Sequence, residues 1–199
     1  MEEELFRMEG ISKRFPGVKA LDKVSLTVNK GEVLGLVGEN GAGKSTLMKI
    51  LSGVYGADEG EIFIEGKKAV IDSVAKAHEL GVSIIMQELN MCVHLSVADN
   101  IFIGRAHKKG IFIDDKTMHE EAKKILDGLG IELNTYARVG SLSIAQQQMV
   151  EIAKAISFNS KILVLDEPTA TLTEREIEQL FGIIRTLNFP PDGRVKPDL

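Results

Sequence analysis

One short stretch of the sequence carries residues that could hold a phosphate group. Residues 38–45 read Gly-Glu-Asn-Gly-Ala-Gly-Lys-Ser, which fits the pattern G-x-x-x-x-G-K-[ST]. Glycines let the backbone curl so that successive N–H groups point at phosphate oxygens. Lys44 would reach the β- and γ-phosphates, and the Ser45 hydroxyl would bind Mg²⁺. The pattern therefore predicts a nucleotide-binding loop; the alternative is a glycine-rich turn with a chance lysine.

A pair of carboxylates provides a second candidate site. Asp166 and Glu167 directly follow the apolar run 162–165, which reads ILVL. A strand beside the phosphate loop would deliver its carboxyl end to the same crevice. Asp166 would then hold Mg²⁺ through water, because this ion keeps much of its hydration shell. Glu167 would orient the attacking water and accept its proton. The alternative is a solvated acidic pair at the end of a strand.

The strands that must position these residues are predicted from the spacing of apolar side chains. Alternation with polar residues indicates a half-buried strand around 24–28, and a more exposed strand at 62–64 before a turn at Gly66. Apolar runs without alternation are typical of strands buried on both faces of a parallel sheet. Three such runs are found, at residues 33–37 (VLGLV), 82–86 (VSIIM) and 162–165.

Helical spacing replaces this pattern between about residues 96 and 157, so we expect an α/β core with a helical insertion. A helix is also expected at 46–51, directly behind the phosphate loop. The other helical positions are Ala122, Ile125, Leu126 and Leu129; Met149, Ile152 and Ile156; and Ile177, Leu180, Phe181 and Ile184. The last twelve residues hold three of the five prolines and are expected to form a loose tail. We therefore divide the chain into 1–94, 95–158, 159–187 and 188–199.

Composition narrows the class of protein. The chain has 199 residues, of which 44% are hydrophobic and 27% charged, which excludes the disordered and fibrous classes. Its net charge of −5 argues against a protein whose main task is holding duplex nucleic acid. A single cysteine, Cys92, cannot form an internal disulfide and predicts a reducing compartment. No apolar run approaches the ~20 residues of a membrane span, and the acidic N-terminus is no secretory signal. A cytosolic chain is expected.

The residues around and between the two motifs resemble the ATP-binding cassette (ABC) family. Residues 139–146, VGSLSIAQ, resemble its signature sequence, and Gln87 matches its glutamine loop. Phe15 stands where the family places an aromatic that stacks on adenine, and 168–173 stand where a loop follows the catalytic base. The resemblance covers about residues 5–187. The stretches FPGVKALDKVSL, MQELN with VADNIFIGR, and SLSIAQQQMVEIAKAI resemble the first cassette of bacterial importers of ribose-type monosaccharides.

This resemblance implies a two-subdomain cassette that works as a head-to-tail pair, with a mixed or parallel sheet core, an antiparallel strand-rich N-terminal part and a helical subdomain. Glu167 and Gln87 would be catalytic, and Ser45, Gln87 and Asp166 would hold Mg²⁺. The residues implied to bind ATP are Phe15, Gly38, Glu39, Asn40, Gly41, Ala42, Gly43, Lys44, Ser45 and Thr46. In the paired cassette, Ser143, the Ala145 backbone and Gln146 would contact the partner's nucleotide.

The resemblance also implies partners and a location. They are a second cassette (in the same longer chain or a dimer mate), membrane permease subunits and, indirectly, a periplasmic or extracellular sugar-binding protein, with no nucleic acid. The chain would lie at the cytoplasmic face of a bacterial membrane and couple ATP hydrolysis to import of a ribose-type sugar.

The sequence departs from the family pattern at three places. The signature reads Leu-Ser-Ile-Ala-Gln instead of Leu-Ser-Gly-Gly-Gln, so Ala145 adds a methyl group where backbone approaches phosphate. Residues 170–173 read ATLT instead of Ser-Ala-Leu-Asp. All four histidines precede Asp166, so none matches the family's switch histidine; they are His78, His94, His107 and His119.

We therefore expect an incomplete cassette that binds Mg-ATP but hydrolyses it about a hundredfold more slowly than a complete one, because one contact to the γ-phosphate is absent. Two alternatives stay open. One is a non-catalytic nucleotide-binding fragment. The other is a soluble ABC ATPase of DNA repair or the ribosome, which would carry a long coiled-coil or strongly basic insertion that residues 96–157 lack.

Overall fold

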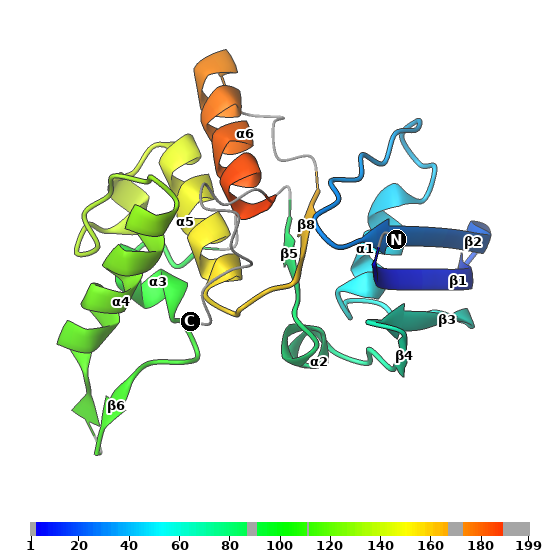
Figure 1. Cartoon of the computed structure of the whole chain (residues 1–199), viewed down its shortest axis with the longest axis horizontal. Coiled ribbons are helices and arrows are strands. Elements are labelled where there is room, and N and C mark those ends of the chain that lie inside the picture. The colour runs from blue at the N-terminus through cyan, green and yellow to red at the C-terminus, as the bar shows by residue number, and fades with distance from the viewer. Residues whose placement is uncertain (1–2, 87–90, 111, 167–172, 189–199) are drawn as a thin grey trace. The chain divides into compact units, whose positions relative to one another are not determined.

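The computed structural model describes residues 3–86, 91–110, 112–166 and 173–188. The chain separates into two compact units, Met1–Ser83 and Ile84–Leu199, coloured blue to cyan-green and green to red in Figure 1. The finer division at residues 94, 158 and 187 stays a prediction.

The first unit is built on a four-stranded antiparallel sheet with the order β2-β1-β3-β4. Its longest strands form a hairpin through Pro16 and Gly17, whose φ of 81° suits the positive-φ position of a tight turn. Two helices complete the unit. The bounds are β1 Glu4–Phe15, β2 Val18–Asn29, β3 Glu59–Ile64, β4 Lys67–Ala69, α1 Lys44–Leu51 and α2 Val74–Glu79.

The core of this unit is formed by side chains at alternating positions of its strands, together with apolar side chains of α1. Phe6, Met8 and Ile11 of β1 are buried, and α1, which contacts β2, buries Leu47 and Leu51. The half-buried strand predicted around 24–28 is confirmed as part of β2. The more exposed strand predicted at 62–64 is confirmed as part of β3, three of whose six residues are exposed. Ile62 and Ile64 are themselves only 7% and 6% exposed, because residues two positions apart share one face of a strand and this face is the buried one.

The buried strand predicted at residues 33–37 is wrong. These residues have no regular secondary structure, and Val33 and Val37 are 64% and 98% exposed. A strand buried on both faces needs a hydrogen-bonded neighbour and apolar cover. Among the described residues, the ladders link β2, β1, β3 and β4 in one sheet, β5 with β8, and β6 with β7, and none includes this run. An apolar sequence alone therefore does not make it a strand.

The second unit is mainly helical. Residues Val82–Ile85 form β5 and pair with β8, Ile162–Leu165, which confirms two of the predicted apolar strands. The helices predicted from apolar spacing are confirmed as α4, α5 and α6. The remaining bounds are α3 Val97–Ile101, β6 Lys108–Lys109, β7 Phe112–Ile113, α4 Asp115–Gly128, the 3₁₀ turn η1 Val139–Ser141, α5 Ile144–Ile156 and α6 Glu174–Asn188.

The core of the second unit lies where α3, α4 and α5 pack together. Ile101 of α3, Leu126 of α4 and Ile152 of α5 are at most 1% exposed and belong to one apolar cluster. That cluster also takes in Ile85 of β5. Within the parts of the chain that the structure describes, no helix is long and apolar enough to span a bilayer.

Candidate functional site

The phosphate loop of residues 38–45 is held in a curl by its own lysine. Lys44 Nζ donates hydrogen bonds to the carbonyl oxygens of Gly38 (2.7 Å) and Glu39 (3.0 Å). The Ala42 N–H donates to the Glu39 carbonyl at 3.2 Å, which tightens the same turn. The ammonium group therefore lies beside the loop backbone, at the position from which it could also bind a phosphate oxygen.

Two glycines of the loop are required by its backbone. Gly41 and Gly43 have φ values of 85° and 88°, in the left-handed region that other L-residues rarely adopt. A Cβ atom on Gly43 would lie 2.6 Å from the Ala20 carbonyl oxygen and 2.8 Å from Leu21 Cδ2, both on β2. The loop therefore passes so close to β2 that only glycine fits at position 43.

The start of α1 is suited to an anion. Its N-cap residue, Gly43, has no side chain to accept a hydrogen bond from the first-turn N–H groups, and the first turn contains no acidic residue. The N–H groups that open an α-helix have no acceptor within the helix and carry partial positive charge. With Lys44 and the half-buried Ser45 beside them, these groups fit the phosphates of a nucleotide, as the sequence predicts.

An aromatic pair at the end of β1 includes one residue that sequence analysis missed. Phe15 is half-buried, and its ring meets that of Tyr55 edge to face, with 5.4 Å between the centroids. Lys13 Nζ lies 5.7 Å from the Phe15 centroid. No spacing rule connects Tyr55 with Phe15, which is 40 positions earlier in the sequence; the only signal was that Tyr55 follows the helix behind the loop.

Asp58 fixes this end of β1. Its carboxylate accepts hydrogen bonds from Lys13 Nζ and from the Arg14 N–H, both at 2.7 Å. The hydrogen bond from Lys13, followed by that from the Arg14 backbone, lowers the pKa of Asp58. Since Lys13 and Arg14 lead directly into Phe15, these contacts hold the aromatic pair at the end of the strand.

In the second unit, the signature residues begin α5. Ser143 is the N-cap of this helix: its hydroxyl accepts a hydrogen bond from the Gln146 N–H at 3.2 Å, and the Gln146 side chain accepts one from the Ser143 N–H at 3.0 Å. Such a reciprocal capping box fixes the helix start. Ile144 is exposed, whereas the Ala145 methyl is buried. Each of the two polar side chains assigned to the partner's nucleotide thus accepts a hydrogen bond from the backbone N–H of the other residue.

The segment before α5 is held by a ladder to residues far away in sequence. The Val139 N–H donates to Leu95 O at 3.0 Å, and the Gly140 N–H donates to Val93 O at 2.9 Å. A Cβ atom on Gly140 would lie 2.9 Å from that same Val93 oxygen. The start of the signature helix is therefore placed by close backbone contact with residues 93–95.

Of the predicted metal and catalytic residues, only Asp166 and Ser45 lie within the described parts of the chain. Asp166 follows β8, and its N–H donates to the Ile85 carbonyl of β5 at 3.0 Å. Gln87 and Glu167 lie outside the described residues, as do positions 168–172. Among the side chains that are described, no group of three or more His, Cys, Asp or Glu residues is arranged to hold a metal ion.

These features define an ATP-binding cassette, and the chain belongs to the ABC transporter family, which matches residues 21–170. The galactose/methyl galactoside import ATP-binding protein MglA of Clostridium perfringens is 55% identical over 183 residues, covering 92% of this chain. The protein of the same name from Escherichia coli is 51% identical over 185 residues, covering 93%. The chain spans only 36% and 37% of the length of these two relatives.

Solved structures confirm the α/β cassette fold. The crystal structure of an ATP-binding cassette of an ABC transporter in its ADP conformation has a TM-score of 0.82 and 33% identity. A nucleotide-free ATP-binding cassette gives 0.83, also at 33% identity. In both comparisons the match covers 93% of this chain and 77% of the other. Similarity of this extent supports an assignment to the family over its phosphate-loop part and its helical part alike.

Proposed function

We propose that this chain binds Mg-ATP and forms part of a transporter that couples ATP hydrolysis to import of a monosaccharide. The observation that carries the proposal is the phosphate loop, in which Lys44 crosses to the carbonyls of Gly38 and Glu39, and Gly43 permits close packing on β2. The relatives are named for galactose and methyl galactoside import, so these two sugars are the first to test, ahead of the ribose expected from the sequence resemblance.

In the proposed site, the loop backbone from Gly38 to Thr46 surrounds the phosphates, and Lys44 neutralises part of their charge. Phe15 stacks on the adenine, next to Tyr55. Ser45, Gln87 and Asp166 hold Mg²⁺, which when bound supplies positive charge to the phosphate oxygens. Glu167 orients the attacking water and accepts its proton, while Gln87 senses Mg²⁺ and that water.

The second cassette of the proposed pair would contact this chain at the amino-terminal end of α5. Ser143, the Ala145 backbone and Gln146 are proposed to contact nucleotide held by the partner cassette. The capping box uses Ser143 Oγ and Gln146 Oε1 as acceptors, so the Ser143 O–H and the Gln146 Nε2 hydrogens can donate to phosphate oxygens without breaking it. Further partners in this proposal are permease subunits at the cytoplasmic face of the membrane and, indirectly, a sugar-binding protein.

Three measurements on the intact chain test this function. The first is binding of Mg-ATP, which Glu167→Gln should leave in place while removing residual turnover. The second is steady-state ATP turnover by the chain. The third is purification with a co-expressed permease. Nucleotide binding without turnover or permease capture would favour a non-catalytic binding protein instead.

A further inference from the structure

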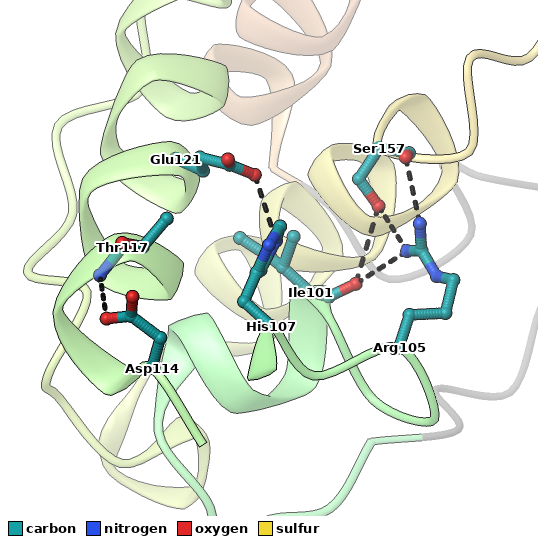
Figure 2. A network of polar contacts seen from close by, with 7 residues as sticks. All are labelled: Ile101, Arg105, His107, Asp114, Thr117, Glu121 and Ser157. Carbon is teal, nitrogen blue, oxygen red and sulfur yellow. Dashed lines mark hydrogen bonds and ion pairs between the residues drawn. The ribbon is translucent and has the colours of Figure 1, made fainter. Parts of the chain in front are cut away.

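One arginine joins the ends of two helices in the second unit. Arg105 follows α3, and Figure 2 shows its guanidinium group facing Ser157, the C-cap of α5. Nη1 donates to the Ser157 carbonyl at 2.9 Å, while Nη2 donates to the Ser157 hydroxyl at 2.6 Å and to the Ile101 carbonyl at 3.1 Å. Ile101 is the last residue of α3. A single side chain therefore bonds the carboxyl ends of both helices.

The surroundings of Arg105 favour this residue over lysine. Its guanidinium carbon lies 3.5 Å from the centroid of the Phe158 ring, so the planar group stacks on that ring. Burial lowers the pKa of Arg105, yet an arginine remains charged at neutral pH. A cation at a helix carboxyl end is stabilising, and here two ends share it. Lysine keeps the charge but has neither the planar fork nor the stacking surface.

The amino-terminal side of α5 is tied to α3 as well. Asn100 of α3 is buried, and its amide binds both backbone groups of Cys92: Oδ1 accepts from the Cys92 N–H at 2.8 Å, and Nδ2 donates to the Cys92 carbonyl at 3.0 Å. Nδ2 also donates to Ser96 O at 2.9 Å. This side chain fixes residues 92–96, on which the ladder to Val139 and Gly140 depends.

We propose that α3 acts as a bracket for the signature helix, with Asn100 and Arg105 as positioning residues for its two ends. Asn100 sets the segment that places Ser143, and Arg105 sets the carboxyl end at Ser157, so together they orient the axis of α5. The functional role of this orientation rests on the proposed function, in which the amino-terminal end of α5 contacts the nucleotide of a second cassette. Neither side chain needs to contact that nucleotide.

The test is hydrogen exchange of the intact chain with substitutions at each end. Arg105→Lys should speed exchange of amides 154–158 about tenfold, because an ammonium group lacks the planar fork that bonds both groups of Ser157 and the Ile101 carbonyl at once. Asn100→Ala should have a comparable effect on amides 92–97 and 139–142. The matched controls are Arg138→Lys and Asn134→Ala, at exposed positions in the same unit. Equal exchange rates of amides 154–158 in Arg105→Lys and in Arg138→Lys would overturn the proposed bracket, even if Asn100→Ala failed to fold.

A second readout separates positioning from simple stability. With Mg²⁺ and a slow-cleaving ATP analogue, amides 143–147 of the unmodified chain should become protected as cassettes pair. Arg105→Lys should lose most of this protection, while the affinity of the phosphate loop stays within about twofold. Faster exchange at 154–158 with full protection at 143–147 would reduce Arg105 to a structural role and overturn the proposal.

Failure of the proposed function can be told apart from failure of the bracket, because it would be visible in the unmodified chain. If the unmodified chain itself showed no binding or no protection, the function would be wrong before any variant was made. The bracket would then be judged by a probe on Cys92, which is exposed and is the chain's only cysteine. A nitroxide there should become more mobile in Asn100→Ala than in Asn134→Ala. Equal mobility would reject the assignment of Asn100.

Discussion

The phosphate loop and the signature helix achieve their geometry in different ways. The loop is built from eight consecutive residues, and its main constraints, the Lys44 hydrogen bonds and the positive φ angles at Gly41 and Gly43, lie within those residues. The signature helix instead depends on distant segments, since its two ends are tied to residues 93–95 and to Arg105, about 50 positions earlier in the chain. Substitutions in the loop should therefore act locally on binding, whereas substitutions around α5 should act through packing.

The largest effect is expected from Lys44→Ala. Removing the ammonium group takes away the main positive charge of the loop and both of its hydrogen bonds to the loop backbone, so Mg-ATP binding should fall below detection, by at least about a hundredfold. Equilibrium titration with a fluorescent ATP analogue measures this loss. Lys67→Ala, at an exposed position of β4 in the same unit, is the control; unchanged affinity in Lys44→Ala would place the nucleotide elsewhere.

Leu126→Ala tests whether the packing of the second unit, which carries the signature helix, is independent of the phosphate loop. This side chain is fully buried in the core of the second unit, so truncation should destabilise that unit by about 2–5 kcal/mol. Urea unfolding followed by a probe in the second unit measures the change. ATP affinity of the folded protein should stay constant, because the loop lies in the other unit. A matching loss of affinity would show that the two regions are not independent.

Gly43→Ala should combine a local clash with backbone strain. The new methyl group would lie 2.6 Å from the Ala20 carbonyl oxygen at a φ of 88°, and strain of this kind costs about 1–3 kcal/mol. We expect lower stability of the first unit together with weakened nucleotide binding. The control is Gly56→Ala, where a Cβ atom meets nothing within 4 Å. Similar behaviour of the two variants would remove the argument for close packing of the loop on β2.

The smallest effect concerns the pH dependence of α4. Asp114 caps this helix by accepting a hydrogen bond from the Thr117 N–H at 3.2 Å (Figure 2), and that bond lowers the pKa of Asp114 below its ordinary 3.8. The cap therefore contributes its full stability above the unfolded-state pKa and loses it as the pH falls through the lower folded-state value. Asp114→Asn keeps an acceptor that does not titrate. Thermal unfolding of both proteins from about pH 5 to 3 should show a slightly flatter profile for the variant; parallel profiles would contradict this.

Sequence reasoning succeeded where short-range patterns decide the structure. The runs at 82–86 and 162–165 predicted β5 and β8, and apolar spacing predicted α4, α5 and α6. It failed for residues 33–37, because a central strand depends on neighbours that the run itself does not encode.

In the candidate site, too, short-range patterns could be recognised in the sequence and long-range contacts could not. The phosphate loop and the Ser143–Gln146 capping box follow from residue types at fixed spacing, so both could be recognised in the sequence. Tyr55 beside Phe15 could not, because their contact depends on how β1 meets the segment after α1. The bond from Arg105 to Ser157 crosses 52 positions and has no local signature, so only the folded chain reveals it.

In the proposed function, the loop at residues 38–45 holds the triphosphate of ATP. Hydrogen exchange of the intact chain, with Mg²⁺ and a slow-cleaving ATP analogue in excess, is the decisive measurement. We expect amides 41–47 to become protected in the unmodified chain and to remain unprotected in Lys44→Ala. Protection that appears elsewhere, or nowhere, while the loop stays folded would contradict the claim.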